Sequence, residues 1–486
     1  MILRSFRGIW GLLQSDMKRS TILLYDIILT NVKNTHEYEE LIKVFLRPQQ
    51  YKLECIEDVA LIKGRKDALC FCGTDDKNAL KKEIYKKLRD ITGSSPPWGI
   101  ITGIRPVKLA GELIRKLGSE TQARAELLDC CMVNEEKADL AIDIYRYQQR
   151  ISGKPPEKSA GIYIGIPFCP TRCLYCSFVS NQKGKEEIDK YLRALYKEID
   201  YVSRGMKEQE LYAETIYIGG GTPTILDNEQ LETFLCTVNE KLRNEKTLEI
   251  TLEAGRPDTI TKSKLEVIHD ADVRRISINP QTMNDQTLKI IGREHTAMQI
   301  REAFKIARDA GIKEINADII AGLPGEDIDD FTATVKEISK LEPDNITVHN
   351  LALKRASRLT AIDRDYHYKI AGTVNKMLRL SRKKMKEAGY RPYYLYRQKQ
   401  TAGAEENTGY CKPGTECIYN IRIMDEHQNL FALGAGGISK VYFPKENRHE
   451  RVANVSNYEI YIDRIGEMIE RKRSGMFAPL KEVAEI

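Results

Sequence analysis

The chain has 486 residues, of which 42% are hydrophobic and 30% are charged. These fractions are typical of a globular protein with two or three domains, and they exclude a disordered or fibrous chain. The net charge of +6 is compatible with an anionic small molecule or a nucleic acid and selects neither. No apolar run approaches the roughly 20 residues of a membrane-spanning helix. Eleven cysteines without an export signal indicate a reducing compartment, so we expect a cytoplasmic protein.

Residues 1–14 have two interpretations. Their apolar side chains, with Arg4 and Arg7 interspersed, fit a weak interfacial helix. Alternatively, Met17 is the true start and the stretch before it is a translated leader without function. The sequence leaves both open.

The N-terminal region, residues 1–151, is predicted to combine a small α/β unit with three helices. Strand-like runs occur at 22–29, 51–56, 59–62 and 68–71. Helical patterns occur at 38–46, 78–88, 106–117, 120–131 and 135–150. The polar, proline-bearing segment 152–159 is predicted to be a linker.

Strand and helix signals then alternate regularly through residues 160–384. The strand signals lie at 162–166, 215–218, 247–252, 275–278, 314–319 and 345–349. Such units imply an α/β fold with a parallel sheet, and six of them favour a partial (β/α)6 TIM-type barrel. The tyrosine- and glycine-rich remainder, 385–486, is predicted to be an irregular α/β region that covers the substrate, ending in a helix at 458–473.

Three cysteines, Cys169, Cys173 and Cys176, form a Cys-x3-Cys-x2-Cys run directly behind the first barrel strand. Three thiolates can hold three corners of a [4Fe–4S] cube, and because such cubes usually take four cysteines, one iron stays open. The usual occupant for this spacing is S-adenosylmethionine, which yields a 5′-deoxyadenosyl radical. Zinc fits poorly, since no partnering cysteine or histidine pair follows nearby. We therefore predict that the three cysteines bind the metal cluster and serve catalysis.

Glycines and polar residues follow the later strands at positions where a barrel places its site. The run Gly219 to Thr222 would let backbone groups approach a ligand, although a tight turn explains such a run equally well. Rim salt bridges are the plain alternative for the polar residues. An acid, an amide and an arginine could instead bind the adenosyl cofactor. The candidates for cofactor binding are Gly220, Gly221, Thr222, Glu253, Gln281, Arg293 and Asp318.

Aromatic residues surround the cysteine run. Tyr175 could offer its face to adenine, and Phe168 and Phe178 could shield the cluster from water. Simple packing is the alternative for all three.

The stretch IYIGIPFCPTRCLYCSFVS at 162–180, followed by GGGTPT, SINPQT, IGREHT and DIIAGLPGE, resembles the oxygen-independent coproporphyrinogen III oxidase family of the radical SAM superfamily. It is most similar to the HemZ subgroup, the coproporphyrinogen dehydrogenases. The resemblance covers about two thirds of the chain, from Gly161 on, and PWGIITGIRP at 97–106 also resembles that subgroup. It implies a radical SAM partial barrel in which the cysteines, the glycines and the polar residues have the roles above. It adds Tyr163 as a tyrosine near the bound cofactor.

Two positions depart from the oxidase proper. That enzyme has a histidine where this chain has Gly165 and a fourth cysteine where this chain has Phe178. The related heme-chaperone branch shares the phenylalanine, but it carries a histidine-containing heme motif. The comparable stretch here, 417–422, reads CIYNIR and contains no histidine.

The resemblance implies oxidative decarboxylation of coproporphyrinogen III to protoporphyrinogen IX in anaerobic heme biosynthesis. The partners would be a tetrapyrrole substrate and a reductant such as flavodoxin or ferredoxin. A heme-binding chaperone and a heme-degrading radical methyltransferase are the alternatives. An RNA-modifying enzyme is disfavoured because the chain has no evident aromatic and basic RNA platform, so we expect no nucleic acid.

The sequence leaves the roles of several other residues undecided. Cys411 and Cys417 could be thiol donors, an auxiliary metal site or free cysteines. His349 could touch the substrate or pack at the rim. A basic run from Arg379 to Lys386 could meet substrate carboxylates or form a solvated helix face.

Overall fold

The computed structural model describes residues 24–57, 65, 67–103, 105–178 and 180–484. They fall into two compact units, which are described separately. Unit 1 contains the chain up to Thr102 and residues 130–132, and unit 2 contains residues 103–129 and the chain from Val133 on. The helix or leader considered for residues 1–14 and the strand predicted at 59–62 lie outside the described residues.

Unit 1 is a small parallel sheet with two helices. Its elements are β1 (Tyr25–Thr30), α2 (His36–Phe45), β2 (Tyr51–Ile56), β3 (Leu69–Cys72) and α3 (Lys77–Thr92). The sheet order is β2-β1-β3, so each parallel neighbour is reached by a crossover. Ile27 and Leu29 of β1 are fully buried with Leu41 and Ile42 of α2. This arrangement matches the α/β unit predicted from the sequence.

Unit 2 contains all other described strands and helices. Its strands are β4 (Ser159–Ile166), β5 (Tyr212–Gly220), β6 (Glu249–Glu253), β7 (Arg275–Ser277), β8 (Glu314–Ala321), β9 (Asn345–Asn350), β10 (Arg391–Arg397), β11 (Glu406–Cys411), β12 (Asn429–Leu433), β13 (Ile438–Phe443) and β14 (Arg448–Ala453). Its helices are α4 (Pro106–Leu117), α5 (Glu120–Ala125), α6 (Glu135–Ile151), α7 (Lys185–Glu208), α8 (Asn228–Lys241), α9 (Lys262–Asp270), α10 (Asp285–Ile290), α11 (Ala297–Asp309), α12 (Ile328–Lys340), α13 (Arg358–Ile362), α14 (Tyr366–Lys369), α15 (Ala371–Glu387), α16 (Ile418–Asp425), α17 (Tyr458–Asp463), α18 (Ile465–Lys472) and α19 (Ala478–Ala484).

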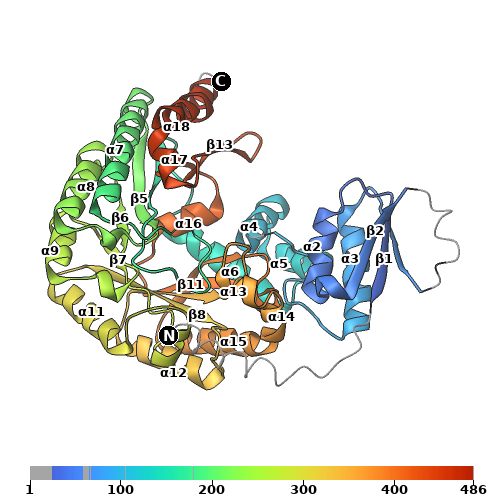
Figure 1. Ribbon diagram of the computed structural model, residues 1–486. Helices are drawn as coiled ribbons and strands as arrows, with labels where there is room; N and C mark the ends of the chain where they lie inside the picture. Colours follow the sequence, from blue (N-terminus) through green and yellow to red (C-terminus); the bar gives the residue numbers. More distant parts are fainter. Residues whose placement is uncertain (1–23, 58–64, 66, 104, 179, 485–486) are drawn as a thin grey trace. The chain divides into compact units, whose positions relative to one another are not determined.

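The predicted six-strand partial barrel is confirmed. Strands β4 to β9 are parallel and lie side by side in chain order within an open sheet that has eleven strands among the described residues. Helices α7, α8, α9, α11 and α12 cover the outer face of the arc that these strands form (Figure 1). Short turns and repeated strand–helix units produce this architecture, as in a TIM barrel that stops before closure.

The two faces of the barrel strands differ in chemistry. Alternate side chains such as Ile216, Ile276 and Ile346 are fully buried in the main hydrophobic core. The intervening side chains of the same strands are polar and face a cavity. Because successive strand residues point to opposite faces, one set stabilises the fold and the other is available for a site.

The C-terminal region is more regular than the sequence indicated. β11 pairs antiparallel with β9 and β10 pairs with β11, whereas β12 pairs parallel with β4 at the other edge and leads to β13 and β14. The strands from residues 385–486 therefore cover both edges of the barrel sheet. An unpaired edge strand exposes main-chain N–H and C=O groups that can pair with another chain. The C-terminal strands pair with these groups of β4 and β9.

Helices α4 to α6 belong to unit 2, although the sequence predicted that they group with the N-terminal region. The Lys137 ammonium of α6 is buried and lies 2.6 Å from a carboxylate oxygen of each of Glu405 and Glu406. The Gln148 amide donates to the Tyr393 carbonyl over 2.8 Å. These buried contacts to β10 and β11 place the unit boundary at residue 102 rather than near residue 151.

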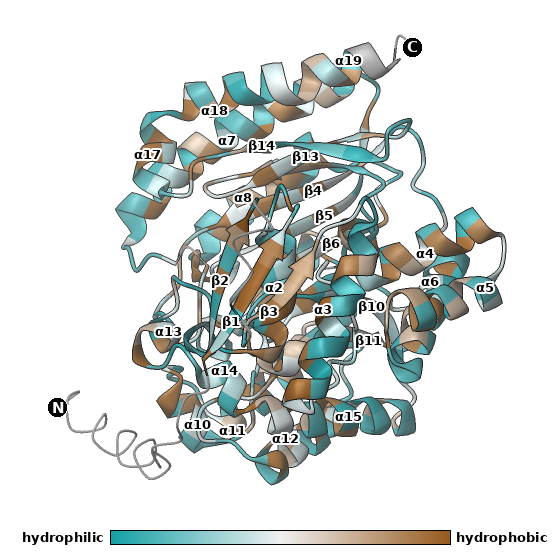
Figure 2. Cartoon of the chain, turned by 90° about the vertical axis from the view of Figure 1, so that its right-hand side faces the viewer, coloured by the Kyte–Doolittle hydropathy of each residue, from teal (hydrophilic) through white to brown (hydrophobic). Residues whose placement is uncertain are grey.

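The helix predicted at 458–473 is divided into α17 and α18 at Arg464. Bands of hydrophilic and hydrophobic residues alternate along α18, the pattern of an amphipathic helix (Figure 2). No helix among the described residues is both long and apolar enough to cross a membrane.

Candidate active site

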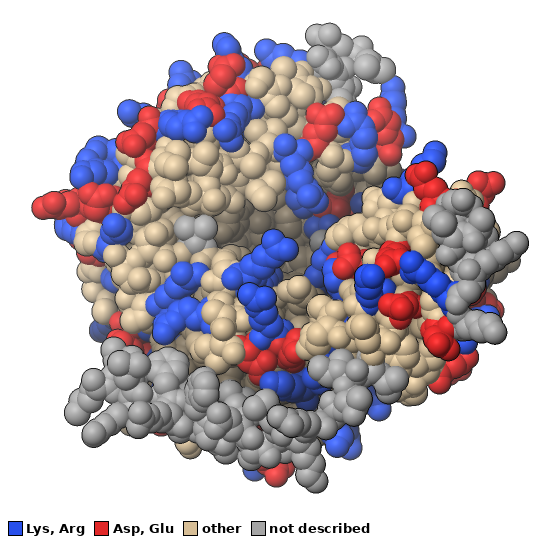
Figure 3. All heavy atoms as spheres, turned by 45° about the vertical axis from the view of Figure 1, so that its right-hand side comes forward, with Lys and Arg blue, Asp and Glu red and all other residues tan. Residues whose placement is uncertain are grey.

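A cavity of about 380 Å³ lies at the carboxyl ends of the barrel strands. In the space-filling view the surface is hollowed near its centre, and Lys and Arg side chains lie along the lower edge of the hollow (Figure 3). Residues from the cysteine loop, from β5 to β9 and from the C-terminal strands line the cavity. The cavity thus combines the motifs that the sequence analysis identified separately.

The cysteine loop follows β4 and is fixed by main-chain hydrogen bonds. The Cys169 N–H donates to the Asn181 carbonyl over 3.0 Å, and the Leu174 N–H donates to the Ile291 carbonyl over 2.9 Å. Cys173 is buried and Cys169 and Cys176 are partly buried, and none of the three forms a disulfide. Three reduced thiols are therefore held on one short, anchored loop.

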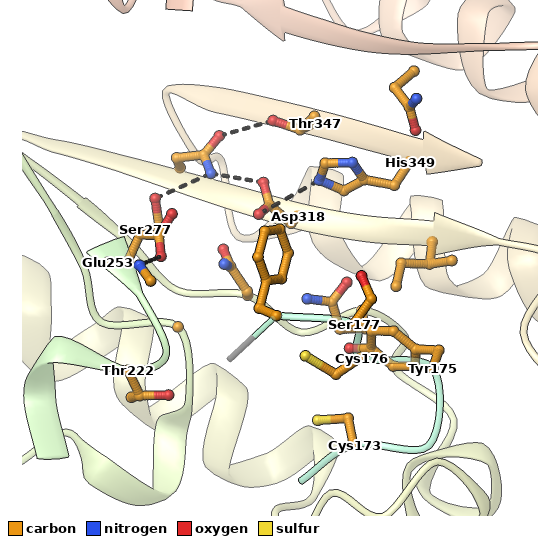
Figure 4. A pocket seen from close by; sticks show the side chains of 18 of the residues that line it. Cys173, Tyr175, Cys176, Ser177, Thr222, Glu253, Ser277, Asp318, Thr347 and His349 are labelled. Atoms are coloured by element: carbon orange, nitrogen blue, oxygen red, sulfur yellow. Dashed lines mark hydrogen bonds and ion pairs between the residues drawn. The ribbon is translucent and has the colours of Figure 1, made fainter. Parts of the chain in front are cut away.

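The three thiols lie on one side of the cavity. All three line the cavity, and the sulfur atoms of Cys173 and Cys176 lie on its side opposite the Asp318–His349 pair (Figure 4). Within the described parts of the chain, no three His, Cys, Asp or Glu side chains converge enough to hold one metal ion. In a [4Fe–4S] cube each cysteine binds a different iron, so separated thiols are what the group requires.

Burial raises the pKa of the Cys169 thiol to about 11, although the Thr222 hydroxyl, 3.5 Å from its sulfur, opposes the shift. The thiol is therefore protonated at neutral pH in the cofactor-free protein. Because thiolate is the metal ligand, cluster binding would release this proton.

The glycine run after β5 packs against the cysteine loop. A Cβ atom at Gly221 would lie 2.4 Å from the Phe168 carbonyl oxygen, and Gly220 has a φ of +111°. The Thr222 N–H donates to the Phe168 carbonyl over 2.8 Å. The run must therefore be glycine because two backbones meet there, and Gly220, Gly221 and Thr222 line the cavity next to the thiols.

Glu253, at the end of β6, is held by two donors. The Tyr217 hydroxyl donates to one carboxylate oxygen over 2.7 Å and the Gly220 N–H donates to the other over 3.3 Å. Burial raises the pKa of Glu253 to about 7, and the nearby Asp318 carboxylate adds to the increase, while the two hydrogen bonds oppose it. Glu253 can therefore gain or lose a proton near neutral pH.

Asp318 of β8 anchors a second polar group. The Asn316 amide donates to it over 2.8 Å, and the His349 ring nitrogen lies 3.6 Å from its other oxygen (Figure 4). Burial would raise the pKa of Asp318, but its interactions with His349 and Asn316 hold the pKa below the usual value. The Tyr396 hydroxyl lies 3.2 Å from the second His349 nitrogen. His349 is thus a cavity residue and not a packed rim residue.

Between these groups lie buried polar atoms without a protein partner. Within the described chain, Asn279 Oδ1, Gln281 Oε1 and Arg293 Nε have no hydrogen bond. Gln281 has a φ of +68°, and its backbone pairs with Asp318 and Ile320 on β8. The Arg293 guanidinium donates to the Asn279 carbonyl over 2.6 Å. Buried atoms of this kind are costly unless a ligand satisfies them, so two acceptors and one donor are available to a bound molecule.

The aromatic candidates separate into two groups. Tyr175 lines the cavity, whereas Tyr163 and Phe168 do not. Phe168 is fully buried between the rings of Tyr191 and Tyr458, so its side chain is part of the core because the loop turns it away from the thiols. Tyr163 stacks on Tyr217 just behind the cavity wall.

Phe178 does not shield the cysteines in the way that the sequence suggested. Its side chain is 64% exposed, although it lies on the cavity lining. It follows the last cysteine at the edge of the loop, where no core surrounds it.

The sequence analysis missed the polar residues inside the strands and the wall from β10 to α16. The missed lining residues include Ser277, Asn316, Thr347, Lys354, Tyr393, Tyr394, Tyr396, Asn407, Asn420 and Met424. Ser277, Asn316 and Thr347 alternate with buried apolar residues along β7 to β9, and this period of two was the available signal. The C-terminal residues carried no comparable pattern.

The remaining candidate residues either form contacts within the fold or lie away from the cavity. Cys411 and Cys417 are buried and free, and the Cys417 thiol donates to Glu249 over 3.3 Å. Cys417 lines the cavity and Cys411 does not. In the basic run of α15, Arg382 binds Glu136 and Glu406, and none of its residues lines the cavity. The run is therefore no part of this site.

Comparison with known proteins agrees with this geometry. The sequence profile of the Radical SAM superfamily matches residues 163–338. The solved structure of coproporphyrinogen III oxidase (HemN) from Escherichia coli, described as a radical SAM enzyme, has the same fold, with a TM-score of 0.52 and 21% identity over 66% of this chain and 72% of that chain. The fold and the three-cysteine loop thus define a radical SAM protein, a class that uses a [4Fe–4S] cluster and S-adenosylmethionine.

Two relatives indicate which family of the radical SAM superfamily the chain belongs to. The chain is 39% identical to the oxygen-independent coproporphyrinogen-III oxidase-like protein HemZ of Bacillus subtilis, over 82% of this chain and 80% of that protein. It is 29% identical to the heme chaperone HemW of Escherichia coli, over 58% of this chain and 70% of that protein. The chain belongs to the HemZ-type, oxygen-independent coproporphyrinogen III oxidase-like family of the radical SAM superfamily.

Proposed function

We propose that the protein oxidatively decarboxylates two propionate side chains of coproporphyrinogen III to vinyl groups, which yields protoporphyrinogen IX. The observation that carries this proposal is the single cavity in which three reduced thiols, orphaned buried polar atoms and a tyrosine-rich wall meet. HemZ and HemN are named for this chemistry, which supports the choice of substrate.

Cys169, Cys173 and Cys176 would hold the cluster, because they are the thiols that line the cavity beside the glycine run. Gly220 and Gly221 would let the cofactor approach the backbone, and Thr222 would contact it beside the thiols. When bound, the cluster and S-adenosylmethionine would supply an electron and a 5′-deoxyadenosyl radical that removes a hydrogen atom from a propionate. Loss of carbon dioxide and of one electron to an electron acceptor would then leave the vinyl group.

Five buried or partly buried side chains would orient the cofactor. The unpartnered Gln281 Oε1 accepts a hydrogen bond from an ammonium or hydroxyl group, and the unpartnered Arg293 Nε donates to a carboxylate. Glu253 and Asp318, each fixed by protein donors, present carboxylate oxygens to ribose hydroxyls. Tyr175 supplies an aromatic face.

An anaerobic assay tests the proposal. The iron-loaded protein, a reductant such as flavodoxin or dithionite, S-adenosylmethionine and coproporphyrinogen III should give protoporphyrinogen IX, carbon dioxide and 5′-deoxyadenosine. Formation of 5′-deoxyadenosine without carbon dioxide would contradict the substrate and leave the radical chemistry intact.

The similarity to HemW supports heme delivery as a second candidate. Stoichiometric heme binding without turnover of coproporphyrinogen III would favour it. Spectral loss of heme in the same mixture would instead indicate a heme-degrading enzyme.

A further inference from the structure

Four cations lie on two chain segments that border the cavity, the cysteine loop and the segment after β9. Lys354, Arg355 and Arg358 are exposed on the segment that follows β9, and Arg172 lies on the cysteine loop. Lys354 lines the cavity itself. Throughout the described chain, none of these four side chains forms an ion pair with a carboxylate within 4.0 Å, unlike most of the cations on α15.

The backbone that carries these cations is fixed at both ends. The Arg172 guanidinium donates to the Ala356 carbonyl over 2.7 Å, and the Leu359 N–H donates to the Leu174 carbonyl over 3.0 Å. On the other side the Leu353 N–H donates to the Gln400 carbonyl over 3.1 Å. The segment 353–359 is therefore held between the cysteine loop and the turn after β10. The charged groups of its side chains are available to a ligand.

None of these four cations has a carboxylate partner within 4.0 Å among the described residues, so an anion bound here would supply the interaction that the protein does not. The Arg172 Nε atom is buried and has no partner among the described residues, which is a second sign of an unfilled donor.

The neighbouring aromatic surface indicates which anion fits. The Lys354 ammonium lies 5.6 Å from the centre of the Phe178 ring, and that ring is 64% exposed at the cavity lining. An exposed ring beside a lysine ammonium suits a flat apolar molecule with carboxylate arms. A free phosphate ion would gain nothing from such an apolar contact.

We infer that Arg172, Lys354, Arg355 and Arg358 form a carboxylate-binding rim that docks the propionate arms of a tetrapyrrole at the cavity mouth. This inference rests on the proposed function and names the residues that recognise its substrate class. The rim would select substrates by the number of their carboxylates. It also gives the exposed Phe178 side chain a role. The sequence analysis expected this ring to shield the cluster from water, and here it would contact the apolar face of the substrate.

Binding of coproporphyrin III, the stable oxidised tetracarboxylate, to the iron-loaded full chain tests the rim by fluorescence quenching. Lys354→Gln and Arg358→Gln should each raise the Kd about 3- to 10-fold, and the double variant should raise it roughly by the product. Lys386→Gln, which removes an exposed lysine of α15 that lies away from the cavity, is the matched control and should bind as the wild type does. Circular dichroism establishes that each variant is folded.

The outcomes separate the two proposals. If the wild type binds coproporphyrin III and both rim variants bind it equally well, the rim is refuted and the proposed function stands. If the wild type itself does not bind coproporphyrin III, the proposed function fails and the rim fails with it. Variants that keep the porphyrin affinity, but lose turnover with flavodoxin and not with dithionite, would show that the cations dock the protein reductant, which also overturns the inference.

Discussion

The three cysteines of the loop after β4 line one cavity together with unpartnered polar atoms. Cys417 also lines this cavity but comes from another segment, and Cys236 is exposed on α8. The spacing of the three loop cysteines was the strongest signal in the sequence, because three thiols must lie close together along the chain to bind one cube. The roles of Phe168 and Phe178 could not be predicted in the same way, since the direction of a loop side chain depends on the tertiary structure.

We predict that Cys169→Ala, Cys173→Ala and Cys176→Ala each abolish binding of the cluster, which brings about four iron atoms per chain. Two thiolates cannot hold the cube against loss to solvent. Iron content and visible absorbance after anaerobic reconstitution measure the effect. Cys236→Ala is the control and should load iron fully, and wild-type loading of Cys173→Ala would contradict the assignment.

The pKa of about 7 at Glu253 predicts a pH dependence of stability in the cofactor-free protein. Folding raises this pKa from its ordinary value of 4.5, so the folded state binds the proton more tightly and loses stability as pH rises from about 4.5 to 7. Burial is the main cause of the raised pKa and the Asp318 carboxylate adds to it, while the Tyr217 hydroxyl and His349 oppose it.

Glu253→Gln should remove this contribution. The fall in the free energy of unfolding between pH 5 and pH 7.5 should be smaller than in the wild type by about 1–2 kcal/mol, because the partial exposure of Glu253 weakens the full effect. Urea unfolding at the two pH values measures it. Glu240→Gln removes an exposed carboxylate and should leave the wild-type slope, and an identical slope in Glu253→Gln would contradict the burial argument.

At the scale of elements, the sequence predicted the positions of the barrel strands but not the polar residues on their inner faces. Strands β4 to β9 lie within a few residues of the predicted runs because parallel buried strands are short and rich in isoleucine and valine. The pairing of the C-terminal strands was not predicted, since β12 pairs with β4 from more than 250 residues away and no local pattern encodes such a contact. The cavity wall that these strands and α16 form was therefore missed as well.

A buried ion pair joins α18 to α7 in this part of the fold. The Lys472 ammonium lies 2.7 Å from Glu198, and both side chains are fully buried. Glu198 also accepts hydrogen bonds from the Gly434 N–H and the Tyr461 hydroxyl. Removal of one charge would leave the other buried and unpaired.

Lys472→Met should therefore lower the free energy of unfolding by about 3–5 kcal/mol. Glu198→Gln together with Lys472→Met should cost clearly less, because no buried charge remains. Chemical denaturation of the two variants measures the difference. Lys340→Gln, which breaks an exposed pair with Glu337, is the control and should cost at most about 1 kcal/mol, and equal losses in all three would exclude a special role for the buried pair.

At the scale of the whole molecule, one open sheet in unit 2 brings together residues that are far apart in the chain. Cys169, Gly220, Asp318 and Tyr396 come from four different segments and meet at one cavity. The order of motifs along the chain predicted this convergence, because parallel strands present their carboxyl ends at one edge. The boundary of unit 1 was not predictable, since Lys137 and Gln148 are bound to strands that follow 250 residues later.

The central claim is that three thiols leave one iron free to bind S-adenosylmethionine. Electron paramagnetic resonance of the reduced, iron-loaded protein, recorded before and after addition of S-adenosylmethionine, tests it most directly. We predict that the cofactor changes the spectrum of the cluster, because it becomes a ligand of the open iron. A spectrum that stays the same at saturating S-adenosylmethionine would contradict the account.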